Sequence, residues 1–105
     1  MTRWRTEDTD TFFRAVLSLR TMEECYAFFG DACTATEVRE MSRRLKVAQL
    51  LREGLNYNTV HQMTGVSTAT ISRVSGCLSY GNQGYQMVLA RIGGADDDGQ
   101  DDSQA

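Results

Sequence analysis

The sequence predicts an all-α protein built from six helices. Proline, which interrupts helices, is absent from the 105 residues. Apolar residues recur three and four positions apart along most of the chain, the spacing that gathers them on one helix face. The capping pattern Thr-x-x-Glu opens two of these runs, at Thr21 and Thr34. Together these observations indicate a helical fold.

Two helices are expected in the first third of the chain. Residues 1–6 are expected to form a short arm, and the first helix begins near Glu7. The second helix follows the Thr21 cap and ends near Gly30. The apolar residues that define the pair are Phe12, Phe13, Val16, Leu17 and Leu19, then Met22, Cys25, Tyr26 and Phe29.

The longest helix is expected between Thr34 and Gly54. Thr34 and Glu37 repeat the capping pattern, and Gly54 is a suitable C-terminal stop. Its apolar stripe consists of Val38, Met41, Leu45 and Ala48, widened by Leu50 and Leu51. The bases on another face are Arg39, Arg43 and Lys46. They form either a solvated charged face or a set of phosphate contacts.

Residues 59–79 indicate a helix-turn-helix. A short helix capped by Asn56 or Asn58 ends at Gly65, which takes a positive φ without a steric penalty. Ser67 is then suited to cap the second helix. The inward residues of that helix, at i, i+3 and i+7, are Ile71, Val74 and Leu78, and the outward ones are Ala69, Ser72, Arg73 and Gly76.

This outward surface suits the major groove of DNA. Small side chains allow a close approach, while Ser and Arg supply hydrogen-bonding groups for bases and phosphates. An ordinary amphipathic helix is the alternative interpretation. Ser, Thr and Gly are poor helix formers, however, and a purely structural helix is better served by Glu, Lys or Ala. We therefore interpret the second helix as a recognition helix.

The distribution of charge supports this interpretation, although the net charge is -3. Five of the 14 acids follow Gly94, which leaves nine acids against all 11 Lys and Arg residues before it. No acid occurs between Gly54 and Ile92. A last helix is expected up to Ile92, and residues 93–105 are expected to form a disordered acidic tail. The tail either solubilises the protein or competes weakly with DNA.

Neither an enzyme nor a metal protein is expected. His61 is the only histidine, and the pattern places no nucleophile or carboxylate near it. Cys25, Cys33 and Cys77 lack metal-ligand spacing and are expected to be reduced core residues. No membrane partner is expected, because no apolar run is long enough to span a bilayer. The start of the chain lacks the apolar region of a signal peptide, so a cytoplasmic location is expected.

The number of aromatic rings predicts a homodimer. Seven large rings are more than one small core easily covers, and a second copy solves the packing problem. The rings are Trp4, Phe12, Phe13, Tyr26, Phe28, Phe29 and Tyr85. A symmetric dimer also presents two recognition helices to adjacent turns of the major groove.

Residues 34–78 resemble the Trp repressor family, and most closely its YerC/YecD (TrpR-related) branch. The match is carried by Thr34 opening a long helix that holds Arg44, by Gly54 closing it, and by the run Ala69-Thr70-Ile71-Ser72-Arg73. Residues 24–26, 78–82 and 84–86 are also similar to the branch. The resemblance covers most of residues 15–92.

The resemblance implies an intertwined homodimer with a helix-turn-helix at each end. It also implies sequence-specific regulation of transcription at a palindromic operator, and repression is the expected outcome. By position, Thr68, Ala69 and Ser72 are expected to face bases, with Ser67 and Thr70 near phosphates. Arg73, on the same outward surface, is expected to contribute to DNA binding.

The resemblance also implies a candidate effector pocket at Thr34, Arg44, Arg73 and Cys77. Two substitutions argue against tryptophan as its ligand. Val74 stands where the Trp repressor has a Gly, and Cys77 replaces a pocket serine. Val74 is expected to point inward and to fill space that an indole needs. No cofactor is therefore expected, and a small acid other than tryptophan remains an alternative effector. Arg44 and Arg73 have a plain alternative role as phosphate contacts or surface ion pairs.

A dimeric protein-interaction module with the same fold, which does not read DNA, is the alternative function. Such a module is free to carry Glu or Asp on its outward surface. A duplex repels carboxylates, so their absence between Gly54 and Ile92 favours DNA binding.

Overall fold

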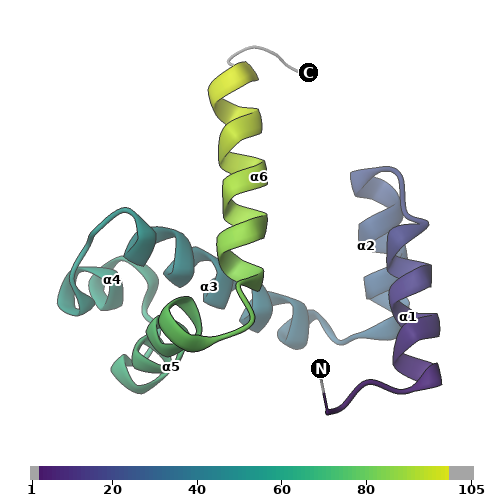
Figure 1. Ribbon diagram of the computed structural model, residues 1–105, viewed down its shortest axis with the longest axis horizontal. Coiled ribbons are helices and arrows are strands. Elements are labelled where there is room, and N and C mark those ends of the chain that lie inside the picture. The colour runs from purple at the N-terminus through teal and green to yellow at the C-terminus, as the bar shows by residue number, and fades with distance from the viewer. Residues whose placement is uncertain (1–2, 100–105) are drawn as a thin grey trace. The chain divides into compact units, whose positions relative to one another are not determined.

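The structure, a computed structural model, describes the backbone of residues 3–99 and the side chains of residues 3–93. Residues 3–99 form six α-helices and no strand, which confirms the all-α prediction (Figure 1). The helices are α1 (Glu7–Leu17), α2 (Met22–Ala32), α3 (Ala35–Arg52), α4 (Tyr57–Thr64), α5 (Thr68–Tyr80) and α6 (Gly84–Gly99). The chain divides into two compact units, Met1–Val38 and Arg39–Ala105, with the boundary in the first turn of α3.

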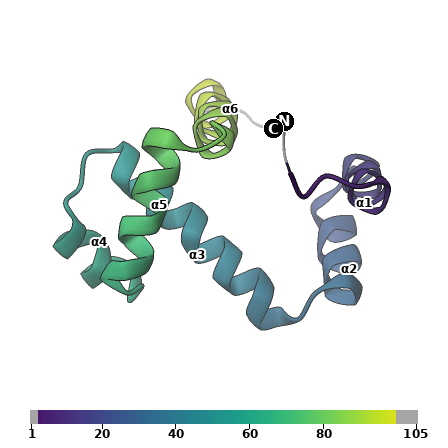
Figure 2. The same ribbon diagram turned by 60° about the horizontal axis from the view of Figure 1, so that its bottom comes forward.

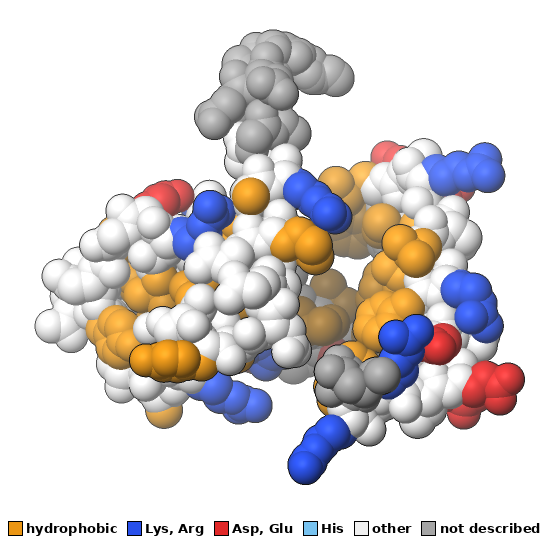
Figure 3. Space-filling view, in the orientation of Figure 1, with side chains coloured by type: hydrophobic (Ala, Val, Ile, Leu, Met, Phe, Trp, Pro, Cys, Tyr) orange, Lys and Arg blue, Asp and Glu red, His pale blue; other side chains and the backbone are white. Residues whose placement is uncertain are grey.

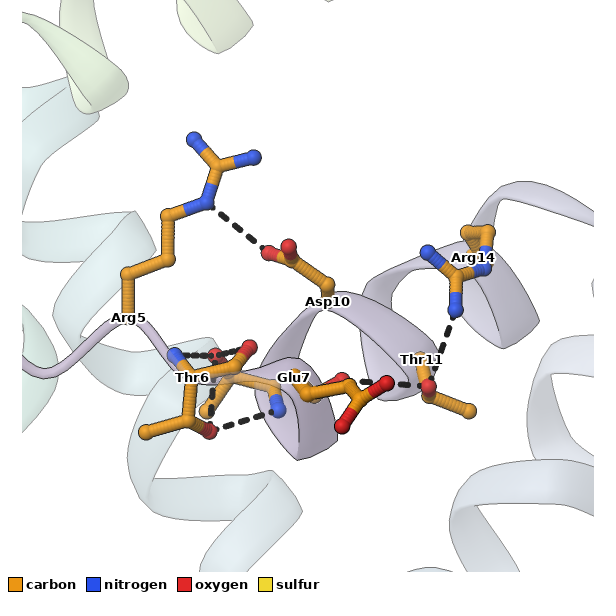
Figure 4. Close-up of polar contacts among 7 residues, drawn as sticks. Arg5, Thr6, Glu7, Asp10, Thr11 and Arg14 are labelled. Carbon is orange, nitrogen blue, oxygen red and sulfur yellow. Dashed lines mark hydrogen bonds and ion pairs between the residues drawn. The ribbon is translucent and has the colours of Figure 1, made fainter.

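Hydroxyl caps start the helices of the N-terminal unit. Thr6 and Thr9 form a reciprocal capping box at α1, with N–H to hydroxyl distances of 2.8 and 3.1 Å, and Arg5 pairs with Asp10 at 2.9 Å (Figure 4). Thr21 caps α2 by accepting from the N–H of Glu24. The predicted capping box there is only half formed, because the Glu24 carboxylate accepts from the N–H of Arg20 instead.

Five aromatic rings of this unit form one cluster, whereas Tyr26 is 74% exposed. The ring centroid of Phe12 lies 5.6 Å from Phe13, 5.7 Å from Phe28 and 6.3 Å from Phe29. Trp4 extends the cluster to Phe13 at 6.2 Å. Even so, neither α1 nor α2 contains a buried residue, and hydrophobic side chains reach the surface over both helices (Figure 3). The unit therefore has rings in contact with one another but no enclosed core.

The C-terminal unit has an enclosed core. Its members come from α3, α4, α5 and α6: Val47, Ala48, Leu50, Val60, Ile71, Val74 and Leu89. The helices α4 and α5 lie side by side in both views (Figure 1, Figure 2). Ala48 and Leu50 were expected in the core, whereas Met41 of the same predicted stripe is 42% exposed. Val47 was missed, because it lies outside the predicted stripe; it is buried in the same core as Ala48 and Leu50, so the covered surface of α3 is wider than the stripe.

The structure tests three further expectations about caps, cysteines and the last helix. Asn56, rather than Asn58, caps α4 by accepting from the N–H of Thr59 at 2.9 Å. Cys77 is exposed and not a core residue, and Cys25 and Cys33 are half-buried; all three thiols are free. The last helix continues past Ile92 to Gly99, so the prediction of a disordered tail is wrong for residues 93–99, whose backbone is helical. Residues 100–105 of the predicted tail lie outside the described residues.

Candidate nucleic-acid interface

The turn between α4 and α5 has the geometry that its sequence predicted. Gly65 ends α4 with a φ of 74°, in the left-handed region that favours glycine. Its N–H donates to the carbonyl of His61 at 2.8 Å. Ser67 follows in an extended conformation and caps α5, because its hydroxyl accepts from the N–H of Thr70 at 3.2 Å. Gly65 and Val66 thus separate Thr64, the last residue of α4, from the cap of α5.

The two sides of α5 differ in burial and in chemistry. Ile71 is 0% exposed and Val74 is 2% exposed, and Leu78 packs against the same core. These residues fix the rotation of the helix about its axis. The exposed residues of α5 are Thr68, Ala69, Ser72, Arg73, Gly76, Cys77, Ser79 and Tyr80. The helix therefore presents small and hydroxyl-bearing side chains and one arginine to solvent.

The electrostatic environment of this surface is basic. Neither α4 nor α5 contains an acid. Arg73 is exposed and has no ion pair among the residues whose side chains are described. On α3, Arg43 pairs with Glu40 at 3.4 Å, but both side chains are more than half exposed, so this pair is screened and weak. The positive charge is thus largely available to an anionic partner.

A polar cavity of about 340 Å³ lies between α3 and the helix-turn-helix. Its lining consists of Glu40, Arg43 and Arg44 from α3, the turn residues Thr64 to Ser67, and Thr70 of α5. The cavity places two arginines opposite the hydroxyls at the start of α5. The guanidinium groups of the two arginines favour an anion here.

The residues of the candidate effector pocket are only partly brought to this cavity. Arg44 lines it, whereas Arg73 and Cys77 do not. Thr34 lies in the N-terminal unit, where its hydroxyl accepts from the N–H of Glu37 at 3.1 Å. Sequence reasoning missed Glu40 and Thr64 as cavity residues. No sequence signal identified them, because the cavity is created by the packing of α3 against a turn some 20 residues later.

Val74 points into the core, as expected, and is not part of the cavity wall. Its side chain is enclosed with Ile71, Val47 and Val60. The inward side of α5 at Val74 is therefore filled by core side chains.

Other kinds of site find little support in the described part of the chain. Among its side chains there is no group of three or more His, Cys, Asp or Glu residues that could hold a metal ion. None of the helices described is both long enough and apolar enough to cross a membrane.

The chain is similar to known proteins over most of its length. The family model of the Trp repressor protein matches residues 7–93. The chain belongs to the Trp repressor family. YerC of Bacillus subtilis (strain 168) is 50% identical over 88 residues, which cover 84% of this chain and 85% of YerC. This relative places the chain in the YerC branch of the Trp repressor family.

Two solved structures extend the similarity to the fold. A TrpR-like protein from Eubacterium eligens ATCC 27750 superposes with a TM-score of 0.82 at 46% identity, covering 85% of this chain and 92% of that one. A candidate Trp repressor from Staphylococcus aureus gives a TM-score of 0.81 at 46% identity, covering 85% of this chain and 89% of its own. The six-helix arrangement is therefore that of Trp repressor-like proteins.

Proposed function

We propose that this protein is a sequence-specific DNA-binding repressor that acts as a homodimer on a palindromic operator in the cytoplasm. The outward surface of α5 carries this proposal. Its side chains are small or hydroxyl-bearing apart from Arg73, and no acid occurs on α4 or α5. Thr68, Ala69 and Ser72 would contact base edges. Ser67 and Thr70 at the start of the helix, together with Arg73, would contact phosphates and so fix the position of the protein along the duplex.

The uncovered rings of the N-terminal unit support the homodimer. Phe12 is 38% exposed, Phe13 47% and Trp4 61%, although these rings contact one another. Exposed clusters of this kind are rare on soluble monomers. On α6, Val88 and Ile92 are also exposed. A second copy of the chain that covers these residues would complete the core, as the intertwined arrangement of the family implies.

Tryptophan is not proposed as a corepressor. The buried methyl groups of Val74 occupy the inner side of α5 next to Arg73. In the proposed function, no bound ligand is needed to hold the recognition helices in place. A different small acid could still reach the cavity that Arg43 and Arg44 line.

The first experiment that tests the proposal is selection of bound fragments from genomic DNA, followed by a titration of affinity across salt concentrations. Affinity should fall steeply as salt rises, since each neutralised phosphate adds about -0.9 to the slope of log K against log salt. Light scattering in parallel should give the mass of two chains. A chain that stays dimeric but binds every duplex weakly and without preference would instead be a protein-interaction module.

A further inference from the structure

We infer that His61 is a positioning residue for the recognition helix, and that it acts through a hydrogen bond from Nδ1–H to the carbonyl oxygen of Val66. The inference deepens the proposed function and rests on it for its effect on DNA. His61 lies on α4, one turn before Gly65, and its side chain is exposed. The Nδ1 atom is 2.7 Å from the Val66 oxygen.

The backbone of Val66 is held by side chains rather than by a helix. Its carbonyl is bonded to His61, and its N–H donates to the hydroxyl of Thr64 at 3.1 Å. That hydroxyl donates in turn to the carbonyl of Val60 at 2.7 Å. Two side chains of α4 therefore fix both polar groups of the turn residue.

Val66 is the residue through which α4 sets the direction of α5. It lies between Gly65, which ends α4, and Ser67, which caps α5. A rotation about either backbone dihedral of Val66 redirects the whole of α5, because the helix after Ser67 moves as one body. Its side chain, which packs against the core, restricts the same rotation. The hydrogen bond from His61 thus restricts rotation at Val66, where a small change in a backbone dihedral would displace every side chain proposed to read bases.

The chemistry of the pair determines the tautomer of the histidine. A carbonyl oxygen only accepts hydrogen bonds, so Nδ1 must carry the hydrogen. In the neutral ring Nε2 is then unprotonated. The competing role for an exposed histidine on this surface is a contact from Nε2 to a DNA phosphate. That role requires Nε2 to carry a hydrogen, so the two roles predict different behaviour.

The tautomer can be measured without DNA. His61 is the only histidine of the chain, so long-range proton–nitrogen correlation spectra report on it without ambiguity. At a pH where the ring is neutral, the inference requires Nδ1 to be the protonated nitrogen. A neutral ring protonated on Nε2 would overturn it. Because no DNA is present, this result is independent of the proposed function.

Paired amide substitutions test the effect on DNA. In His61→Asn the amide nitrogen replaces Nδ1, whereas in His61→Gln it replaces Nε2. We expect His61→Asn to keep operator affinity within about twofold and His61→Gln to lose about fivefold to tenfold, the value of one net hydrogen bond. Affinity for random duplex should change less than operator affinity, since phosphate contacts do not depend on base register.

Gln62→Asn is the matched control, because Gln62 is the exposed neighbour of His61 and Asn is the weaker helix former. It should leave operator affinity unchanged. Retained affinity in His61→Gln with a loss in His61→Asn would assign the role to Nε2 and overturn the inference. An equal loss in both variants, or no loss in either, would also overturn it. If the wild type bound no duplex, the proposed function would fail, while the tautomer would still decide whether the bond exists.

Discussion

Arg73 and Val74 are consecutive in α5, yet their side chains have opposite environments. Arg73 is exposed and Val74 is 2% exposed. Because successive residues of an α-helix are 100° apart, this pair marks the edge between the exposed side of α5 and the core. Arg73 leads to a prediction about DNA binding on the exposed side, and Val74 leads to a prediction about ligand binding on the buried side.

Arg73→Ala should weaken operator binding about tenfold at moderate salt, the cost of losing one arginine contact, and should leave the melting temperature unchanged. Fluorescence anisotropy and thermal denaturation measure the two effects. Arg91→Ala, which removes the same charge from the exposed side of α6, is the matched control and should bind normally. Unchanged affinity in Arg73→Ala would contradict the proposed role of this surface.

Tryptophan should give no heat of binding to the wild-type protein in isothermal titration calorimetry, because Val74 fills the inner side of α5. The same titration on Val74→Gly tests whether the two methyl groups are what excludes the indole. A clear heat of binding to the wild type would contradict the argument from Val74.

Ile71→Ala should lower the free energy of unfolding by about 2–5 kcal/mol, because the side chain is completely buried and its removal leaves a cavity. Ser72→Ala, one position later on the exposed surface, should change that free energy by less than about 0.5 kcal/mol. Urea denaturation of both variants gives the comparison. Similar costs at the two positions would mean that α5 is rotated from the described orientation.

Gly65→Ala should destabilise the protein by about 1–2 kcal/mol, the cost of placing an L-residue with a Cβ in the left-handed region. The cost is conformational, since no atom other than those of residue 65 and its two chain neighbours lies within 4 Å of the added Cβ. Gly76→Ala is the matched control inside α5, where the added Cβ also meets open space. Gly76→Ala should raise the free energy of unfolding by about 0.5–1 kcal/mol. Chemical denaturation of the two variants should therefore show changes in this free energy of opposite sign.

Glu37 should titrate below its ordinary pKa of 4.5. The N–H of Thr34 donates to its carboxylate at 2.8 Å and the Thr34 hydroxyl does so at 3.1 Å, and both bonds lower the pKa by favouring the charged form. Carboxyl-detected NMR titration measures it. Thr34→Ala should raise this pKa part of the way back, because the backbone bond remains, while Thr36→Ala should not change it.

The same shift has a consequence for stability. A lowered pKa in the folded state means that ionised Glu37 stabilises the fold at pH values above 4.5, and that this contribution is lost as the pH falls through the folded-state pKa. The stability difference between wild type and Glu37→Gln should therefore narrow on acidification. A difference that widened below pH 4.5 would have the wrong sign for this capping box.

The local structure of this protein was largely predictable from its sequence. Ser67, Gly65 and the pair Thr34 and Glu37 act at single turns, where one side chain or one φ angle decides whether a helix starts or stops. The inward direction of Ile71 and Val74 likewise follows from a period of 3.6 residues. Similarity over residues 7–93 then agrees with the family that these signals indicated.

Only the tertiary structure decided which side of α3 is covered and which residues meet across the turn. Val47 is buried and Met41 is not, although both are apolar residues of one helix. Arg43, Thr64 and Thr70 line one cavity, and His61 reaches the carbonyl of Val66. Periodicity specifies which residues share a helix face, but the partner of that face depends on how the helices pack. Contacts between residues far apart in the sequence are therefore set by the packing of the whole unit.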